Sequence, residues 1–143
     1  MNVASILKGK GGDIITANAK DEITAVAGIL GKNKIGAVLI VDDHQKMMGV
    51  ISERDIVRGL SETGDACLRT KVTELMTSDV ITCSPSDTID EVMALMTQKR
   101  IRHLPVMEGG ELVGFISIGD VVKNRMDEVE REAAAMRDYI ATG

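Results

Sequence analysis

The sequence predicts a mixed α/β fold made of two copies of one small unit, each with the element order β-α-β-β-α. Three observations support this prediction. The chain repeats itself once, each copy carries apolar residues at helical spacing, and each copy then carries two apolar runs around a polar turn. One such unit buries too little surface to be stable alone, so we expect the copies to pack together. Clefts between packed units are common ligand sites.

The internal repeat is the most informative feature of the chain. Residues 13–41 align without a gap on residues 79–107, and 49–57 align on 114–122 after a shift of one residue in a turn. The identical pairs in the first block are Asp13/Asp79, Ile15/Ile81, Thr16/Thr82, Asp21/Asp87, Ile23/Ile89, Val26/Val92 and Ile35/Ile101. Chance does not easily give this order and spacing, so the sequence indicates a duplication.

Each copy is expected to begin with a short strand, at 14–16 and at 80–82, followed by a helix. The helix carries apolar residues at positions i, i+3, i+4 and i+7, which marks one buried face. These residues are Ile23, Val26, Ala27 and Leu30 in the first copy and Ile89, Val92, Met93 and Met96 in the second. The segment Ser-Pro-Ser-Asp at 84–87 is expected to start the second copy's helix, because its side chains can accept free amide hydrogens.

Two apolar runs around a polar turn predict a β-hairpin in each copy, and a second helix then closes the copy. The runs and turns are 37–41, 42–45 and 47–51 in the first copy, and 104–107, 108–111 and 112–116 in the second. The expected organisation is a first copy over 1–60, a linker over 61–71, a second copy over 72–126 and a C-terminal helix over 127–143.

The motif Gly-x-Ile-Ser-x-x-Asp occurs at 49–55 and at 114–120, where each hairpin leads into its closing helix. One interpretation is a capping box, with serine at the N-cap and an acid at N3. The other is a ligand site, because a helix N-terminus attracts anions and an aspartate one turn in can accept hydrogen bonds from the two hydroxyls of a ribose. The motif is compatible with both interpretations at once.

The repeat order and these motifs resemble a tandem pair of CBS domains, the modules named after cystathionine β-synthase. The resemblance extends from Val3 to Met126, and the second copy adds Arg-Ile-Arg-His-Leu-Pro-Val at 100–106, which is similar to a strand of that family. It implies an α+β fold of two CBS units packed with pseudo-twofold symmetry. It also implies a stand-alone regulatory, energy-sensing module that binds an adenine nucleotide such as AMP, ADP, ATP or NAD, or S-adenosylmethionine, between the repeats.

The resemblance implies a role for each matching residue of the second copy. Asp120 would bind the ribose hydroxyls, Ser117 would lie near the phosphate, and the backbone of Thr82 would contact the adenine edge. Ile101 would line the adenine pocket, Arg102 and His103 would contact phosphate, and Pro105 would belong to the same site. The matching residues of the first copy are Thr16, Ile35, Gly36, Ala37, Ser52 and Asp55.

The first copy departs from this pattern. Leu39, Gly36 and Ala37 stand where the second copy has Pro105, Arg102 and His103, and they leave only Lys34 as a nearby cation. We therefore expect two unequal sites.

Arg54 lies inside the first copy's motif, where the second copy has Gly119. It is compatible with an exposed helix residue, and equally with a residue that reaches, across a pseudo-twofold axis, the phosphate held by the second copy.

Composition argues against several other functions. The net charge of −5 and the scarcity of aromatic residues, Phe115 and Tyr139 alone, argue against nucleic-acid binding. Cys67 and Cys83 form no framework of disulfides and lack the spacing of a metal site, and no catalytic triad or carboxylate pair stands out. No apolar run is long enough to cross a membrane and no signal-peptide pattern is visible, so the cytoplasm is the expected location.

The C-terminal segment carries an apolar stripe at alternating spacings of four and three residues. Its members are Val122, Met126, Val129, Ala133, Met136 and Ile140. The helix is compatible with packing on its own unit or on a second subunit, and we expect a homodimer in which it serves as a packed arm. For the whole chain, the alternatives to a nucleotide sensor are an interaction module with empty clefts and an enzyme that acts on a nucleotide.

Overall fold

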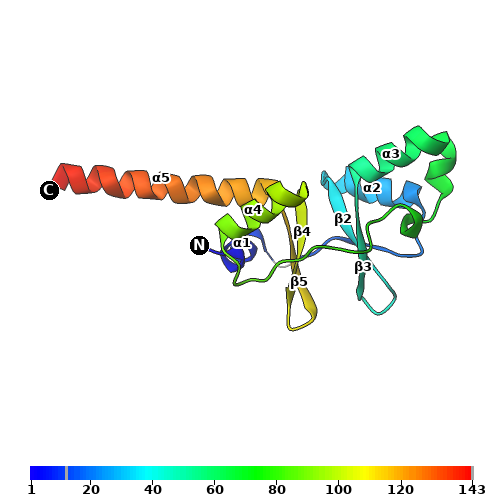
Figure 1. The fold of residues 1–143 in the computed structure, drawn as a ribbon, viewed down its shortest axis with the longest axis horizontal. Helices are drawn as coiled ribbons and strands as arrows, with labels where there is room; N and C mark the ends of the chain where they lie inside the picture. The colour runs from blue at the N-terminus through cyan, green and yellow to red at the C-terminus, as the bar shows by residue number, and fades with distance from the viewer. Residues whose placement is uncertain (12, 143) are drawn as a thin grey trace. The chain divides into compact units, whose positions relative to one another are not determined.

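The computed structural model of the protein describes residues 1–11 and 13–142, so Gly12 and Gly143 lie outside the described residues. Its helices and strands are interspersed along the chain (Figure 1). They are α1 Val3–Lys10, β1 Thr16–Asn18, α2 Ile23–Asn33, β2 Ala37–Val41, β3 Met47–Ser52, α3 Glu53–Thr63, η1 Gly64–Arg69, η2 Val72–Glu74, α4 Ile89–Lys99, β4 His103–Glu108, β5 Glu111–Ser117 and α5 Ile118–Thr142. The mixed fold class predicted from the sequence is confirmed.

The chain forms two compact units. The middle unit comprises Asp13–Ile81, and the terminal unit comprises Met1–Gly12 together with Thr82–Gly143. The middle unit thus holds the motif of the first copy, and the terminal unit holds the motif of the second. The residues that precede the first copy lie in the terminal unit, together with the motif of the second copy. The residues that precede the second copy lie in the middle unit, together with the motif of the first copy.

The middle unit is a three-stranded sheet with helices packed on it. Strand β2 lies at the centre, parallel to β1 and antiparallel to β3. The core of the unit combines the helix-facing side of the sheet with the predicted stripe of α2; its buried members include Ile23, Val26, Leu30, Val38, Ile40 and Ile51. The expected first strand, 14–16, is displaced to Thr16–Asn18.

The terminal unit contains the antiparallel hairpin β4–β5, with Gly109 and Gly110 in the turn at positive φ. The strand expected at 80–82 is wrong: a single parallel bridge joins Cys83 to Val106 instead. In the first copy, Thr16 pairs with Leu39, and the matching residue on β4 is Pro105. Proline has no N–H to donate to a ladder, which gives a physical reason why the pairing shrinks to one bridge here.

Helix α4 begins later than the sequence predicted. Residues 84–87 form a turn in which the Ser84 N–H donates to the Asp87 carboxylate at 2.9 Å. The N-cap is Thr88, whose hydroxyl accepts from the Glu91 N–H at 3.1 Å while Glu91 bonds back to Thr88. Thr88 and Glu91 therefore form a capping box, and the helix starts there and not within 84–87.

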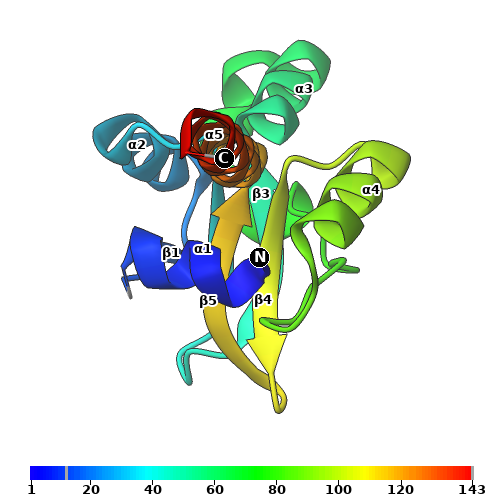
Figure 2. The ribbon, with the colours of Figure 1, turned by 90° about the vertical axis from the view of Figure 1, so that its left-hand side faces the viewer.

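The two units hold their exchanged segments with matching hydrogen bonds. The bonds are Val3 N to Asp87 O and Ile89 N to Met1 O in the terminal unit, and Val72 N to Asp21 O and Ile23 N to Thr70 O in the middle unit. In the terminal unit, α1 packs against β5 and the start of α5 (Figure 2). This exchange could not be seen in the alignment of the two copies.

The segment expected as a polar linker is ordered along most of its length. Helix α3 continues to Thr63 and is followed directly by η1. Cys67 of η1 is buried against Gly59 of α3, so this segment contributes to the core of the middle unit.

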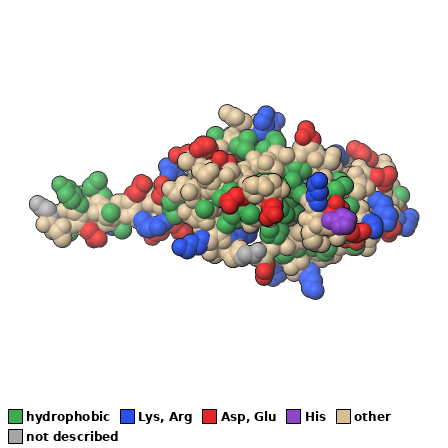
Figure 3. Space-filling view, turned by 90° about the horizontal axis from the view of Figure 1, so that it is seen from below, with side chains coloured by type: hydrophobic (Ala, Val, Ile, Leu, Met, Phe, Trp, Pro, Cys, Tyr) green, Lys and Arg blue, Asp and Glu red, His purple; other side chains and the backbone are tan. Residues whose placement is uncertain are grey.

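Helix α5 is 25 residues long, whereas its counterpart α3 has 11. Its first turns pack on α4 and β5, and its C-terminal part extends beyond the rest of the terminal unit (Figure 1). Hydrophobic side chains gather at the end of this extension (Figure 3). Met126 is 66% exposed and Ile140 is 72% exposed. In the described part of the chain, no helix is long and apolar enough to span a bilayer.

Candidate functional site

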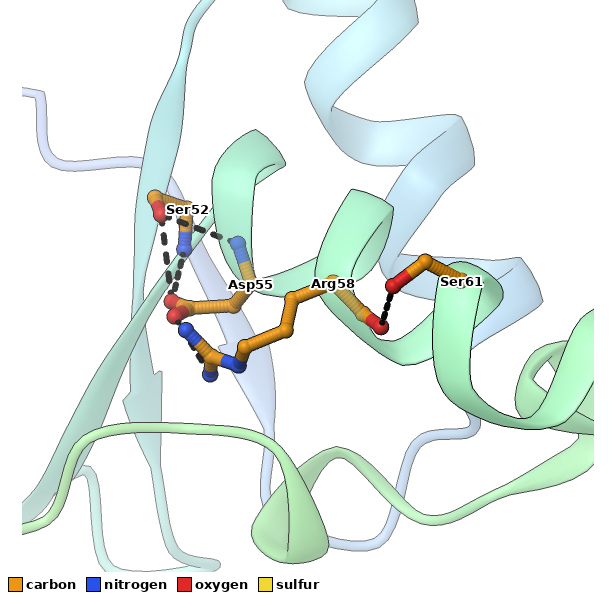
Figure 4. A network of polar contacts seen from close by, with 4 residues as sticks. All are labelled: Ser52, Asp55, Arg58 and Ser61. Carbon is orange, nitrogen blue, oxygen red and sulfur yellow. Dashed lines mark hydrogen bonds and ion pairs between the residues drawn. The ribbon is translucent and has the colours of Figure 1, made fainter.

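In the middle unit, the motif forms a capping box at the junction of β3 and α3. Ser52 is the N-cap, and its hydroxyl accepts from the Asp55 N–H at 3.4 Å. Asp55 Oδ2 accepts from the Ser52 N–H at 2.9 Å and from the Ser52 hydroxyl at 3.1 Å (Figure 4). The capping interpretation of the motif is therefore confirmed in this copy.

The second oxygen of Asp55 is also engaged. The Arg58 guanidinium donates to Asp55 Oδ1 at 3.0 Å, and Figure 4 shows the Arg58 side chain lying toward Asp55. The pair is separated by three residues on α3, a spacing that places side chains side by side on a helix. The sequence analysis did not identify Arg58 as a partner of Asp55, although the three-residue spacing is visible in the sequence. Arg54, the other arginine of this turn, is exposed on α3.

In the terminal unit, the same motif lies at the junction of β5 and α5 and has a different partner. The Asp120 N–H donates to the Ser117 hydroxyl at 3.2 Å, and Asp120 Oδ2 accepts from the Ser117 N–H at 2.8 Å. Lys10, the last residue of α1, donates to the same Oδ2 at 2.7 Å and to the Phe115 carbonyl at 2.8 Å. These bonds to the carboxylate all use Oδ2, and Oδ1 takes part in none of them.

The surroundings of Asp120 favour its charged form. Partial burial opposes ionisation, but the hydrogen bond from Lys10, the bonds from Ser117 and the Lys10 charge together hold the pKa of Asp120 below its ordinary value. The pKa is lower in the folded chain, so the stability that this carboxylate adds is present above its unfolded pKa and is lost as the pH falls through its folded pKa. At neutral pH Asp120 is therefore ionised.

The start of β4 and the residue before it place two candidate phosphate-binding residues, His103 and Arg102, beside the first turn of α5. His103 pairs with Ser117 across the hairpin, and the Arg102 carbonyl accepts from the Ile118 N–H at 2.7 Å. The His103 ring stacks on Phe115 with centroids 5.6 Å apart. Side chains alternate along a strand, so His103 and Ser117 share the face opposite the buried Leu104.

The remaining candidates of the second copy lie on either side of α4 and in β4. Ile101 is half-buried between α4 and β4, and Thr82 is exposed and adjacent to the bridge at Cys83. The Cys83 N–H donates to the Pro105 carbonyl at 3.0 Å, which fixes this segment against β4. The backbone pairings therefore bring Arg102, His103 and Ser117 together where the hairpin leads into α5, and Thr82 lies beside the bridge to β4.

The first copy repeats this backbone arrangement with Gly36 and Ala37 in place of Arg102 and His103. Ala37 pairs with Ser52, and the Glu53 N–H donates to the Gly36 carbonyl at 2.9 Å. Thr16 begins β1 opposite Leu39, and Ile35 is half-buried before β2. The middle unit therefore offers the same backbone frame around a carboxylate, Asp55, whose second oxygen is taken by Arg58.

A groove of about 490 Å³ opens between α2 and α3 of the middle unit. Its lining is mainly apolar and consists of Ala27, Leu30, Gly31, Lys34, Ile35, Gly36, Glu53, Ile56 and Val57. The groove includes two predicted residues, Ile35 and Gly36, but not Ser52 or Asp55. It adjoins the start of α3 through Glu53.

The cysteines lack the properties of reactive groups. Cys67 and Cys83 are both free and buried. Burial, reinforced by the nearby Asp87 charge, raises the pKa of Cys83 to about 12, so its thiol is protonated at neutral pH and is a poor nucleophile. Among residues 1–11 and 13–142, no cluster of His, Cys, Asp and Glu could hold a metal ion.

Lys10 is a site residue that the sequence did not predict. It lies 110 positions before Asp120 and reaches it only because α1 packs in the terminal unit. No local spacing rule predicts such a contact.

Comparison with known proteins gives a consistent result. A family model described as CBS domain matches residues 10–62 and 72–127. The mitochondrial CBS domain-containing protein CBSX3 of Arabidopsis thaliana is 31% identical over 99% of this chain and 72% of its own length. The crystal structure of the CBS-domain containing protein ATU1752 from Agrobacterium tumefaciens is 42% identical, covers 87% of this chain and 92% of that one, and superposes with a TM-score of 0.85.

Similar structures also include complexes with ligands. The CBS domain pair of protein MJ0100 was crystallised in complex with 5′-methylthioadenosine and S-adenosyl-L-methionine. The MJ0100 domain pair is 29% identical to this chain. The match covers 90% of this chain and 98% of the MJ0100 chain, with a TM-score of 0.79.

Proposed function

Because this chain belongs to the CBS domain family, we propose that it is a regulatory, non-catalytic module that binds an adenine nucleotide at the Ser117–Asp120 pair of its terminal unit. AMP, ADP, ATP and NAD all share the adenosine and phosphate groups that this site would recognise. One observation carries the proposal. Asp120 uses a single carboxylate oxygen for the helix cap and for Lys10, which leaves Oδ1 outside those bonds.

The same carboxylate can therefore serve the cap and a ligand. Two neighbouring ribose hydroxyls donate hydrogen bonds, and an ionised aspartate accepts through both oxygens. The positive end of the α5 helix dipole lies at this first turn and favours a phosphate nearby. Arg102 and His103 flank that turn and supply the cationic and hydrogen-bonding groups that phosphate needs.

The base would be held by apolar and backbone contacts. Ile101 is half-buried and offers an apolar surface, and the backbone at Thr82 lies beside β4 through the Cys83 bridge. The ligands of the MJ0100 domain pair support this part of the proposal, because both contain adenosine.

The two copies should bind unequally. The middle unit has Gly36 and Ala37 in place of Arg102 and His103, and its Asp55 is paired with Arg58. Titration of nucleotide-free protein with AMP should therefore show one tight site, with the second site weaker or absent. Isothermal titration calorimetry measures this directly. Two identical, independent sites would contradict the proposed asymmetry, and an absence of saturable binding would contradict the function itself.

We also propose that two chains pair through α5. The apolar stripe from Val122 to Ile140 lies along a helix whose members are largely exposed in one chain, and exposed apolar stripes commonly mark interfaces. Closed twofold pairing is the commonest form of oligomer. The stripe includes the small Ala133, which favours a packed arm over a long coiled coil.

Removal of the residues after Met126 should weaken this dimer without unfolding either unit, because both hairpins, α1 to α4 and the first turns of α5 precede that point. Light scattering across a concentration series gives the dimer fraction. In the full chain, Met136→Glu on the stripe should act in the same direction, whereas Arg137→Glu beside it should not. A full-length monomer at high concentration would refute the dimer, and a dimer unaffected by truncation would place the interface on the units themselves.

A second candidate function is an interaction module without ligand. The complete capping boxes favour it, since helix capping alone accounts for Ser52, Asp55, Ser117 and Asp120. The cations at the terminal unit favour nucleotide binding over this alternative, because a cap does not need them.

The cytoplasmic location expected from the sequence remains part of the proposal.

A further inference from the structure

We propose that Lys10 makes the Asp120 site selective for phosphate-bearing ligands over uncharged or cationic adenosine compounds. This inference rests on the proposed function and specifies its ligand class. The observation behind it is the position of the Lys10 ammonium, which lies 2.7 Å from Asp120 Oδ2 and 2.8 Å from the Phe115 carbonyl oxygen.

The Lys10 ammonium occupies the place of a ligand's donor group. A ribose that used both oxygens of Asp120 would have to take over Oδ2 from Lys10, since that oxygen already accepts from the Ser117 N–H as well. Lys10 is thus a competitor built into the chain. Its side chain is 41% exposed, so it can leave Asp120 without unfolding the unit.

The displaced ammonium cannot move far from the site. Lys10 is the last residue of α1, and α1 is anchored in the terminal unit by the buried Val3 and Ile6. The Gly11 N–H donates to the Leu7 carbonyl at 3.2 Å and closes the helix just beyond Lys10. Only the flexible four-carbon stem of the lysine can move, so its charge remains within a side-chain length of the ligand.

The charge of the ligand then decides the cost of displacement. A ligand with a phosphate provides a new partner for the ammonium and replaces the ion pair that it breaks. An uncharged nucleoside leaves the ammonium without its counterion, and a sulfonium places a second positive charge near it. Arg102 adds a further cation at this end of the hairpin, which strengthens the preference for an anion.

The preference is specific to the terminal unit. In the middle unit, the partner of Asp55 is Arg58 from the same helix, and Arg58 bonds to Oδ1 rather than to the oxygen used by the cap. The two candidate sites therefore differ in the origin and the position of the cation that a ligand would meet.

The test compares AMP with 5′-methylthioadenosine in the full-length protein and in Lys10→Met. In the wild type, AMP should bind more tightly at the Asp120 site. In Lys10→Met, methylthioadenosine should gain affinity because its competitor is gone, while AMP loses a phosphate partner as it gains access to Asp120. The ratio of the two dissociation constants should fall about tenfold or more, which is the size expected for one charged hydrogen bond.

Two further variants control for effects of the substitution itself. Lys10→Arg retains the cation and should preserve the preference for AMP. Lys8→Met removes an exposed lysine from the same last turn of α1 and should leave the ratio unchanged. An unchanged ratio in Lys10→Met, with AMP still bound, would overturn the role of Lys10 and leave the proposed function intact. If neither compound binds to the wild type or to any variant, the proposed function fails and this inference fails with it.

Discussion

Replacement of Asp120 by alanine is expected to weaken AMP binding to the terminal unit by about 1.5–3 kcal/mol, or roughly 10- to 150-fold in the dissociation constant. The substitution removes the only carboxylate of the Ser117–Asp120 motif and, with it, the acceptors for two ribose hydroxyls. Titration calorimetry on the purified variant measures the change, and circular dichroism establishes that the fold is retained.

The repeat provides a matched control for this experiment. Asp55→Ala removes the hydrogen bond that the Asp55 carboxylate accepts from the Ser52 N–H. This bond is equivalent to the one that the Asp120 carboxylate accepts from the Ser117 N–H. It should therefore impose a similar cost on its helix while it leaves the tight AMP site unchanged. An Asp120→Ala protein that is folded and binds AMP with wild-type affinity would show that the carboxylate only caps α5.

Replacement of Gly49 by alanine is expected to destabilise the middle unit by about 2–4 kcal/mol, in the upper range for overpacked sites. A Cβ atom on Gly49 would lie 2.6 Å from the Thr77 carbonyl oxygen and 2.8 Å from the Met76 sulfur. The carbonyl belongs to the backbone and is held by a pair of 2.9 Å hydrogen bonds between Thr77 and Val50. The new methyl group therefore has to separate β3 from the segment that carries Thr77.

Gly28→Ala is the control for the loss of glycine itself. Gly28 lies in α2, and no atom comes within 4 Å of a Cβ built there, so alanine should be neutral or stabilise the helix by up to about 1 kcal/mol. Urea unfolding of both variants gives the difference in midpoint. Equal midpoints for the Gly49 and Gly28 variants would mean that the exchanged segment is not held against β3 as described.

The sequence was sufficient for the parts of the fold that depend on local periodicity. The stripe beginning at Ile23 and its counterpart at Ile89 gave α2 and α4, and the two hairpins followed from apolar runs around polar turns. The prediction of a strand at 80–82 was wrong because strand pairing there depends on a partner distant in sequence, and that partner is Pro105. The predicted start of α4 was wrong because both 84–87 and the adjacent Thr88 could cap a helix. Thr88, together with Glu91, is the residue that does so.

The candidate site shows the same division. The Ser–Asp motifs could be recognised because each bond within them spans three residues. Lys10 could not be recognised, because its contact with Asp120 depends on which unit receives α1. The alignment of the copies shows that a segment precedes each repeat, but it does not show that the two units exchange these segments.

A crystal structure of the protein with AMP is the most direct test of the central claim, that the Ser117–Asp120 pair is a nucleotide site. We predict that the ribose hydroxyls lie within hydrogen-bonding distance of the Asp120 carboxylate, that the phosphate lies near Ser117 and Arg102, and that the Lys10 ammonium has turned from Asp120 toward the phosphate. AMP bound elsewhere, with the Lys10–Asp120 pair intact at 2.7 Å, would contradict this account.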